Sequence, residues 1–108
     1  MPISSDLLRG HTDTIILAQL ARGDNYGYEI NKNIQQLTNG EYGLKEATLY
    51  TAFKRLEQAG LIRSYWGEEG AGARRRYYAI TEEGMAQLEE SRMEWNHTRA
   101  LLDALVSG

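Results

Sequence analysis

The sequence contains no cysteine and only one proline, and it has no long apolar run. Without cysteine the chain cannot form disulfides, thiolate metal sites or a thiol nucleophile, and this usage is typical of a reducing compartment. The longest unbroken apolar stretch, Ile15 to Ala18, is far too short to span a bilayer, and no basic leader precedes a long apolar segment. We therefore expect a soluble, cytoplasmic protein that does not act at a membrane.

Groups suited to catalysis or cofactor binding are also scarce. The two histidines, His11 and His97, lie far apart in the sequence and do not have metal-ligand spacing. The glutamates show no paired arrangement, and the glycine-rich "GEEGAG" (67–72) is not followed by the GK[ST] of a phosphate-binding loop. The sequence therefore predicts no enzyme, no metal site and no cofactor.

Acidic residues outnumber basic ones, 15 to 12, but the two signs are unevenly distributed along the chain. Residues 45–76 carry seven basic and four acidic side chains, whereas residues 1–44 carry three and five. Residues 77–108 carry two and six. A chain of net negative charge can thus present a localised positive surface, which would attract a polyanion.

The hydrophobic pattern predicts three helices in the first 60 residues. The first runs from about residue 6 to 21, although Gly10 weakens its start. The second covers about 26–37, with Asp24 or Asn25 as its N-cap. The third, "KEATLYTAFKRLEQAG" (45–60), places leucines and phenylalanine on one stripe and threonine, lysine and arginine on the other side. Each helix has one apolar face, as expected for a small helical core.

The rest of the chain predicts a β-hairpin and a long helix. The hairpin strands are "LIRSYW" (61–66) and "RRRYYAI" (74–80), joined by a turn-rich segment. Thr81 is the expected N-cap of a last helix that reaches about Val106. We therefore predict a mainly α fold with a small β-hairpin (α+β), a winged helix-turn-helix followed by a long C-terminal dimerisation helix. The winged domain would span 1–80 and the dimerisation helix 81–108, with 1–22 also contributing to the dimer interface.

Two clusters suit DNA binding in such a module. The polar side of the third helix could read base edges and phosphates in the major groove, but it could equally be a solvated surface. The arginines at 74, 75 and 76 could contact phosphates, or they could only protect an edge strand from aggregation. Because side chains alternate along a strand, Arg74 and Arg76 should face one side and Arg75 the other.

The last helix carries a repeating apolar stripe. Leu88, Trp95 and Leu102 recur every seven residues, which is typical of a coiled-coil interface, although arginines interrupt the stripe. A two-fold dimer would cover it and would pair two reading helices on a palindromic site. The predicted dimerisation residues are Met85, Leu88, Trp95, Leu102 and Leu105. The alternative for Trp95 is simple core packing.

Three stretches resemble the PadR family of bacterial transcriptional regulators: "GYEI" (27–30), "EATLYTAFKRLEQAGLI" (46–62) and "SYWGEEGAGARRRYYAIT" (64–81). They are most similar to its short-tailed, multidrug-binding branch, partly because Thr51 stands where the broader family has proline. The resemblance implies a homodimer that represses a nearby efflux or stress operon on double-stranded DNA. It also implies release when a planar aromatic inducer is sandwiched between tryptophans at the dimer centre.

By position, the resemblance assigns both sets of contacts. The DNA-binding residues would be Tyr28, Lys45, Thr48, Tyr50, Thr51, Lys54, Arg55, Arg74, Arg75 and Arg76. The ligand-binding residues would be Leu7, Gly10, Thr14, Ser91, Trp95 and Arg99. Arg99 stands where the branch has an acidic residue, so neutral or anionic aromatics would suit this chain better than cationic drugs. Two alternatives stay open from the residues alone: a winged helix used for protein contacts, and a DNA binder without a ligand.

Overall fold

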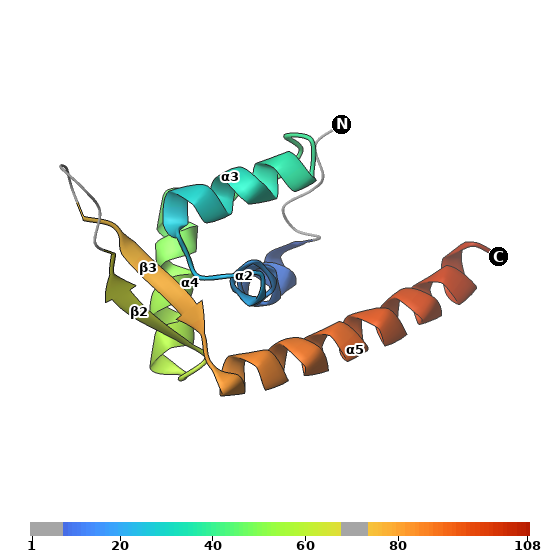
Figure 1. The fold of residues 1–108 in the computed structure, drawn as a ribbon. Coiled ribbons are helices and arrows are strands. Elements are labelled where there is room, and N and C mark those ends of the chain that lie inside the picture. The colour runs from blue at the N-terminus through green and yellow to red at the C-terminus, as the bar shows by residue number, and fades with distance from the viewer. Residues whose placement is uncertain (1–7, 68–73) are drawn as a thin grey trace.

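The computed structural model describes residues 8–67 and 74–108. Three helices surround one core, a small sheet lies beside them, and a long last helix leads away from the body (Figure 1). The elements are η1 (Arg9–His11), α2 (Thr12–Ala21), β1 (Asn25–Tyr26), α3 (Gly27–Leu37), α4 (Glu46–Gln58), β2 (Ile62–Trp66), β3 (Arg76–Ile80) and α5 (Glu82–Val106). The mainly helical fold with a β-hairpin and a long C-terminal helix is as predicted.

The start of the first helix differs from the prediction. Arg9–His11 form a single 3-10 turn, and the α-helix begins only at Thr12. Gly10 lies in this turn, where its missing side chain lowers helix propensity. The α-helix ends at Ala21, and Gly23 has a positive φ of 150°.

The sheet has three strands where the sequence predicted two. β3 lies in the centre, with β2 and β1 antiparallel on either side, in the order β1-β3-β2. In β1, Asn25 is paired with Tyr78 and Tyr26 with Tyr77. Asn25 does not cap α3 as predicted, because its carboxamide oxygen accepts a hydrogen bond from the Tyr26 N–H (2.9 Å), and no side chain caps α3. The N-cap predicted at Asp24 or Asn25 is therefore wrong: Asn25 is the first residue of β1, Asp24 precedes it, and Tyr26 is at the N-cap position of α3.

One hydrophobic core holds the helices and the sheet together. Its largest fully buried side chains include Phe53, Ile16 and Ile30, each of which contributes about 1.5–3 kcal/mol by leaving water. The ring of Phe53 stacks on the ring of Tyr78 with centroids 3.9 Å apart, which fixes α4 against the central strand. Burial raises the pKa of the Tyr78 hydroxyl above its ordinary value. The helix that carries the candidate reading face is therefore firmly seated.

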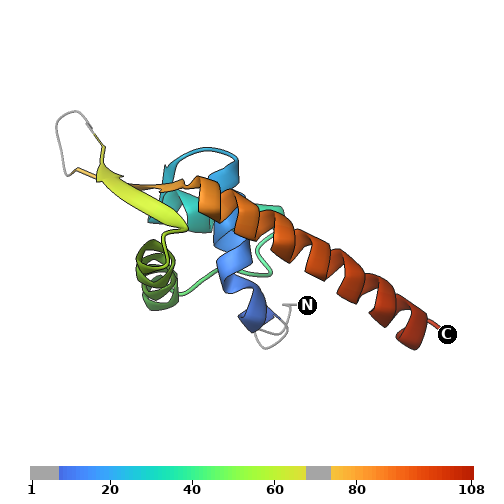
Figure 2. The same ribbon diagram turned by 90° about the horizontal axis from the view of Figure 1, so that it is seen from below.

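α5 begins inside the domain and ends outside it. Thr81 is its N-cap, as predicted, and its hydroxyl accepts a hydrogen bond from the Gly84 N–H (3.0 Å). Leu88 is 0% exposed and packs in the core of its own chain. The prediction that Leu88 lies on the dimerisation face is therefore corrected: within this chain it has no surface left for a second subunit. Beyond Ser91 every residue of α5 is exposed, and the helix projects from the body (Figure 2).

Candidate nucleic-acid interface

α4 presents a polar surface because its leucine and phenylalanine side chains face inward. Leu49, Phe53 and Leu56 are buried, spaced four and three residues apart as one face of a helix requires. The predicted DNA-binding residues on and next to α4 are all exposed: Lys45, Thr48, Tyr50, Thr51, Lys54 and Arg55. The structure thus places this part of the predicted set at the surface.

The start of α4 is fixed by a residue that the sequence did not single out. The Asn31 side chain donates a hydrogen bond to the Leu44 carbonyl (2.8 Å) and accepts one from the Leu44 N–H (2.8 Å). This pair joins α3 to the segment that enters α4. These bonds therefore fix the position of α3 relative to the start of α4. α3 also contributes Tyr28 to the candidate interface, and this side chain is 72% exposed.

The arginines of the wing, which we define as β2 with β3 and their connection, alternate as predicted. The guanidinium of Arg75 lies 4.7 Å from the ring centroid of Tyr26, whereas Arg74 and Arg76 lie 5.9 and 5.3 Å from that of Trp66. Arg76 also donates a hydrogen bond to the Ser64 hydroxyl (2.7 Å), which in turn donates one to the Glu57 carboxylate (2.7 Å). The other part of the connection, residues 68–73, lies outside the described residues.

Residues of α3, α4 and the wing line one shared hollow, which we call the tyrosine–arginine pocket. It has a volume of about 310 Å³ and joins the start of α3, the outer face of α4 and the wing. Its lining is Tyr26, Gly27, Tyr28, Tyr50, Arg74, Arg75 and Arg76. A side chain at Gly27 would meet the Tyr50 hydroxyl at 2.6 Å, so glycine is what lets Tyr50 lie against α3. The guanidinium of Arg75 lies over the Tyr26 ring at this hollow, whereas those of Arg74 and Arg76 lie over Trp66. Phenol hydroxyls and a guanidinium at one hollow can hold phosphate oxygens.

Sequence reasoning missed three neighbours of this pocket. Tyr26 was predicted to belong to the second helix, and Trp66 was predicted only as a strand residue. Neither was predicted to contact the arginines of the wing. Lys32 lies one helical turn beyond Tyr28, and both line a second hollow of about 240 Å³ between α3 and α4. Their spacing of four residues was the signal that could have identified Lys32.

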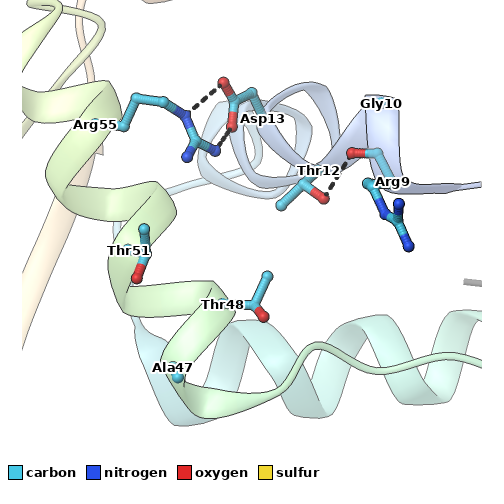
Figure 3. A pocket seen from close by; sticks show the side chains of 8 residues that line it. All are labelled: Arg9, Gly10, Thr12, Asp13, Ala47, Thr48, Thr51 and Arg55. Carbon is cyan, nitrogen blue, oxygen red and sulfur yellow. Dashed lines mark hydrogen bonds and ion pairs between the residues drawn. The ribbon is translucent and has the colours of Figure 1, made fainter. Parts of the chain in front are cut away.

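A third pocket, of about 500 Å³, separates the first turns of α2 from α4 (Figure 3). Thr48 and Thr51 lie on its α4 wall, and Asp13 lies on its α2 wall. Arg55 does not extend outward as a free side chain: its Nε donates a hydrogen bond to the Asp13 carboxylate (3.2 Å), and its Nη2 pairs with the other carboxylate oxygen. This hydrogen bonding raises the pKa of the Arg55 guanidinium above its ordinary value.

The predicted ligand residues are only partly brought together. Trp95 is 43% exposed, and its ring makes an edge contact with the ring of His11, whose centroid is 5.4 Å away. Gly10 is adjacent to His11 in the chain, whereas Arg99 donates a hydrogen bond to Asn96 on its own helix (2.9 Å). Thr14 and Ser91 are half-buried, and Leu7 lies outside the described residues. The ring that packs on Trp95 within the described residues is that of His11. From the sequence, His11 was weighed only as a metal ligand.

The described residues contain no cluster of three or more histidine, aspartate or glutamate side chains that could hold a metal ion. Likewise, none of the helices in residues 8–67 and 74–108 is both long and apolar enough to cross a membrane.

Comparison with known proteins identifies the family. The family model described as "Transcriptional regulator PadR-like family" matches residues 16–90. The chain belongs to this family. A solved transcriptional regulator from Clostridium thermocellum is 51% identical, with a TM-score of 0.88 over 96% of this chain and 98% of its own. A PadR family transcription regulator from Clostridium difficile is 38% identical, with a TM-score of 0.78 over 89% of this chain and 98% of its own.

A sequence relative from Lysinibacillus sphaericus is 42% identical, and the match covers 98% of this chain and 97% of the relative. The match to PadR structures confirms the predicted winged helix-turn-helix with a long C-terminal helix. The chain is a DNA-binding transcriptional regulator of the PadR-like family, a class of proteins that are generally not enzymes.

Proposed function

We propose that this PadR-like protein is a homodimeric repressor of an efflux or stress operon. It binds a palindromic double-stranded operator and releases it when a planar aromatic compound binds between the subunits. α4 enters the major groove, where Thr48 and Thr51 meet base edges, and the wing lies along the backbone.

The tyrosine–arginine pocket is the observation that carries this proposal. Its lining brings together three tyrosines from β1, α3 and α4 and the three arginines of the wing, although the chain as a whole is acidic. An accidental surface of an acidic chain would not be expected to have three arginines and three tyrosines as close neighbours. Phosphate contacts of this kind fix the register of a protein on the duplex, which then positions the reading helix.

The end of α5 supports the dimer. Leu101 and Leu102 are half exposed, and Leu105 and Val106 are 79% and 78% exposed, so a row of apolar side chains has no cover within the described part of the chain. Apolar surface of this extent on a projecting helix favours association with a second copy. A two-fold axis would place two α4 helices about one DNA turn (~34 Å) apart, as a palindrome requires.

The half-exposed ring of Trp95 supports the ligand site. It offers one face or edge to solvent while His11 covers another part of it, so a flat aromatic molecule could stack there without removing a packed core residue. The cation of Arg99 lies one turn further along α5 and favours neutral or anionic ligands. Release follows if the ligand stabilises a spacing of the two α4 helices that no longer matches the half-sites.

A binding titration tests this function. The dimer should bind DNA from upstream of its own reading frame more tightly than a random duplex of equal length, and the affinity should fall steeply with salt. Replacing Arg74 and Arg75 together with alanine should flatten that salt dependence. Salt-independent binding, or equal affinity for both duplexes, would contradict a sequence-specific repressor.

A further inference from the structure

The ion pair between Arg55 and Asp13 has a geometry that bears directly on DNA binding. Arg55 lies on the exposed side of α4, and Asp13 lies in the first turn of α2. Two neighbouring nitrogens of the guanidinium, Nε and Nη2, each bind a different oxygen of the carboxylate. This is the paired arrangement in which an arginine also binds two oxygens of a phosphate.

The carboxylate therefore occupies the side of Arg55 that a DNA phosphate would otherwise take. It also neutralises the charge, so Arg55 adds little to the positive field of α4 as long as the pair is closed. Both side chains are about half exposed, at 53% and 42%, and exposed pairs of this kind are weak enough to open. Thr48 and Thr51 remain on the wall of the same pocket, so Asp13 restrains the charged residue and leaves the hydroxyls in place.

We propose that Asp13 limits the sequence-independent part of the DNA affinity: it competes with DNA phosphate for Arg55. This inference rests on the proposed DNA-binding function. Charge contacts to phosphate strengthen binding to every sequence, whereas base contacts distinguish one sequence from another. By withholding one arginine from the backbone, Asp13 lowers the affinity for random DNA and for the operator by the same phosphate contact, so a larger share of the remaining operator affinity comes from base contacts.

Four variants of the full chain test the competition: wild type, Asp13→Asn, Arg55→Gln and the double variant. Each is titrated with the operator and with a random duplex between 50 and 200 mM salt. Asp13→Asn should bind random DNA more tightly, and its log–log salt slope should be steeper by about 0.9, one extra phosphate. Over that salt range it should then lose roughly 3.5-fold more affinity than wild type. Arg55→Gln should leave the wild-type slope unchanged but abolish the gain of Asp13→Asn.

A matched control separates local competition from a change in net charge. Glu89→Gln removes the same charge and also frees an arginine, because Glu89 pairs with Arg92 (2.8 Å) on α5, at a similarly exposed position. It should leave the salt slope unchanged. A slope increase in Glu89→Gln equal to that in Asp13→Asn would overturn the competition.

Two other results would overturn the inference while leaving the DNA-binding function intact. One is an Asp13→Asn slope equal to that of wild type. The other is an Arg55→Gln slope that is shallower than the wild-type slope by about 0.9. Arg55 would then already bind a phosphate in the wild-type protein, in spite of Asp13. A wild-type protein that binds neither duplex at low salt would instead contradict the proposed function itself. The Arg55 Nε–H resonance provides a direct check: random DNA should shift it in Asp13→Asn and hardly at all in wild type.

Discussion

The guanidinium of Arg75 lies over the ring of Tyr26, 4.7 Å from its centroid, on the side of the sheet that faces away from Trp66. Arg76, its neighbour, lies over Trp66 and is fixed by a hydrogen bond to Ser64. The adjacent arginines of the wing therefore have different surroundings, and they should not contribute equally to DNA binding.

We predict that Arg75→Gln weakens DNA binding more than Arg76→Gln does. The guanidinium of Arg75 lies over the Tyr26 ring at the tyrosine–arginine pocket, whereas the guanidinium of Arg76 donates a hydrogen bond to Ser64, which is bound in turn to the Glu57 carboxylate. Arg75→Gln should reduce the salt slope by about 0.9, as expected for the loss of one phosphate contact, and Arg76→Gln should reduce it by less. Fluorescence anisotropy with a labelled operator measures both.

Equal slopes for the two variants would show that the alternation along the wing is irrelevant to binding. Thermal unfolding of both proteins is the control, since each substitution removes a cation over an aromatic ring, which contributes about 0.5–1 kcal/mol at an exposed site.

Local sequence signals predicted most of the fold. The buried stripe of α4, the Thr81 cap and the alternation of the arginines all follow from helix and strand periodicity, and the structure confirms them. β1 was missed because two residues are too short for any periodicity to be visible. The Asp13–Arg55 pair joins residues 42 positions apart, and nothing local marks such a contact.

For Leu88, the seven-residue periodicity correctly predicted an apolar helix face, but the assignment of that face to the dimer interface was wrong at this residue. A seven-residue apolar stripe shows which residues share a helix face, but it does not show whether that face meets its own domain or a second subunit. In α5 the stripe changes its environment along the helix: Leu88 is buried in its own core, while Leu102 and Leu105 are exposed.

This difference gives a paired prediction for α5. Leu105→Glu places a charge on the exposed apolar end of the helix and should shift the protein from dimer to monomer without unfolding it. Leu88→Ala leaves a cavity in the core and should lower the free energy of unfolding by about 2–5 kcal/mol. Sedimentation analysis reports the first change and denaturant unfolding the second.

The two substitutions serve as controls for each other. The prediction would be contradicted if Leu88→Ala gave a folded monomer while Leu105→Glu stayed fully dimeric. The dimer contact would then lie at the N-terminal end of α5, near Leu88.

The proposed binding of a ligand beside Trp95 should be visible in tryptophan fluorescence. We predict that a planar, neutral or anionic aromatic compound quenches the emission of Trp95, because stacking brings the two ring systems into contact. Trp95→Ala should abolish the quenching and leave the protein dimeric. Trp66 is the second tryptophan and is half exposed, so the measurement is made in a Trp66→Phe background.

The same titration distinguishes a regulator with a ligand from one without. Quenching that persists in Trp95→Ala would move the site elsewhere, and a ligand that quenches but does not release the operator would separate binding from regulation. Replacing Arg99 with Glu should reverse the charge preference towards cationic aromatics, because the charge one helical turn beyond Trp95 changes sign.

The joint between the winged domain and α5 depends on Gly84. A Cβ at this position would lie 2.1 Å from the Leu61 carbonyl oxygen, a distance that no rotamer change relieves because the obstacle is backbone. That oxygen is also held in place, since it accepts a hydrogen bond from the Thr81 N–H (3.1 Å). Gly84→Ala must therefore displace the start of α5 from β2, and we expect it to cost at least about 2 kcal/mol of unfolding free energy.

Gly10→Ala is the matched control for this substitution. Gly10 has no neighbour within 4 Å of the added carbon and lies in the exposed turn before α2. The same methyl group should there be neutral or stabilise by up to about 1 kcal/mol, since alanine favours helical conformations over glycine. Denaturant unfolding of the two variants side by side measures the difference. If Gly84→Ala were as stable as Gly10→Ala, the first turn of α5 would have to lie further from β2 than the structure places it, and the direction in which α5 leaves the domain would change with it.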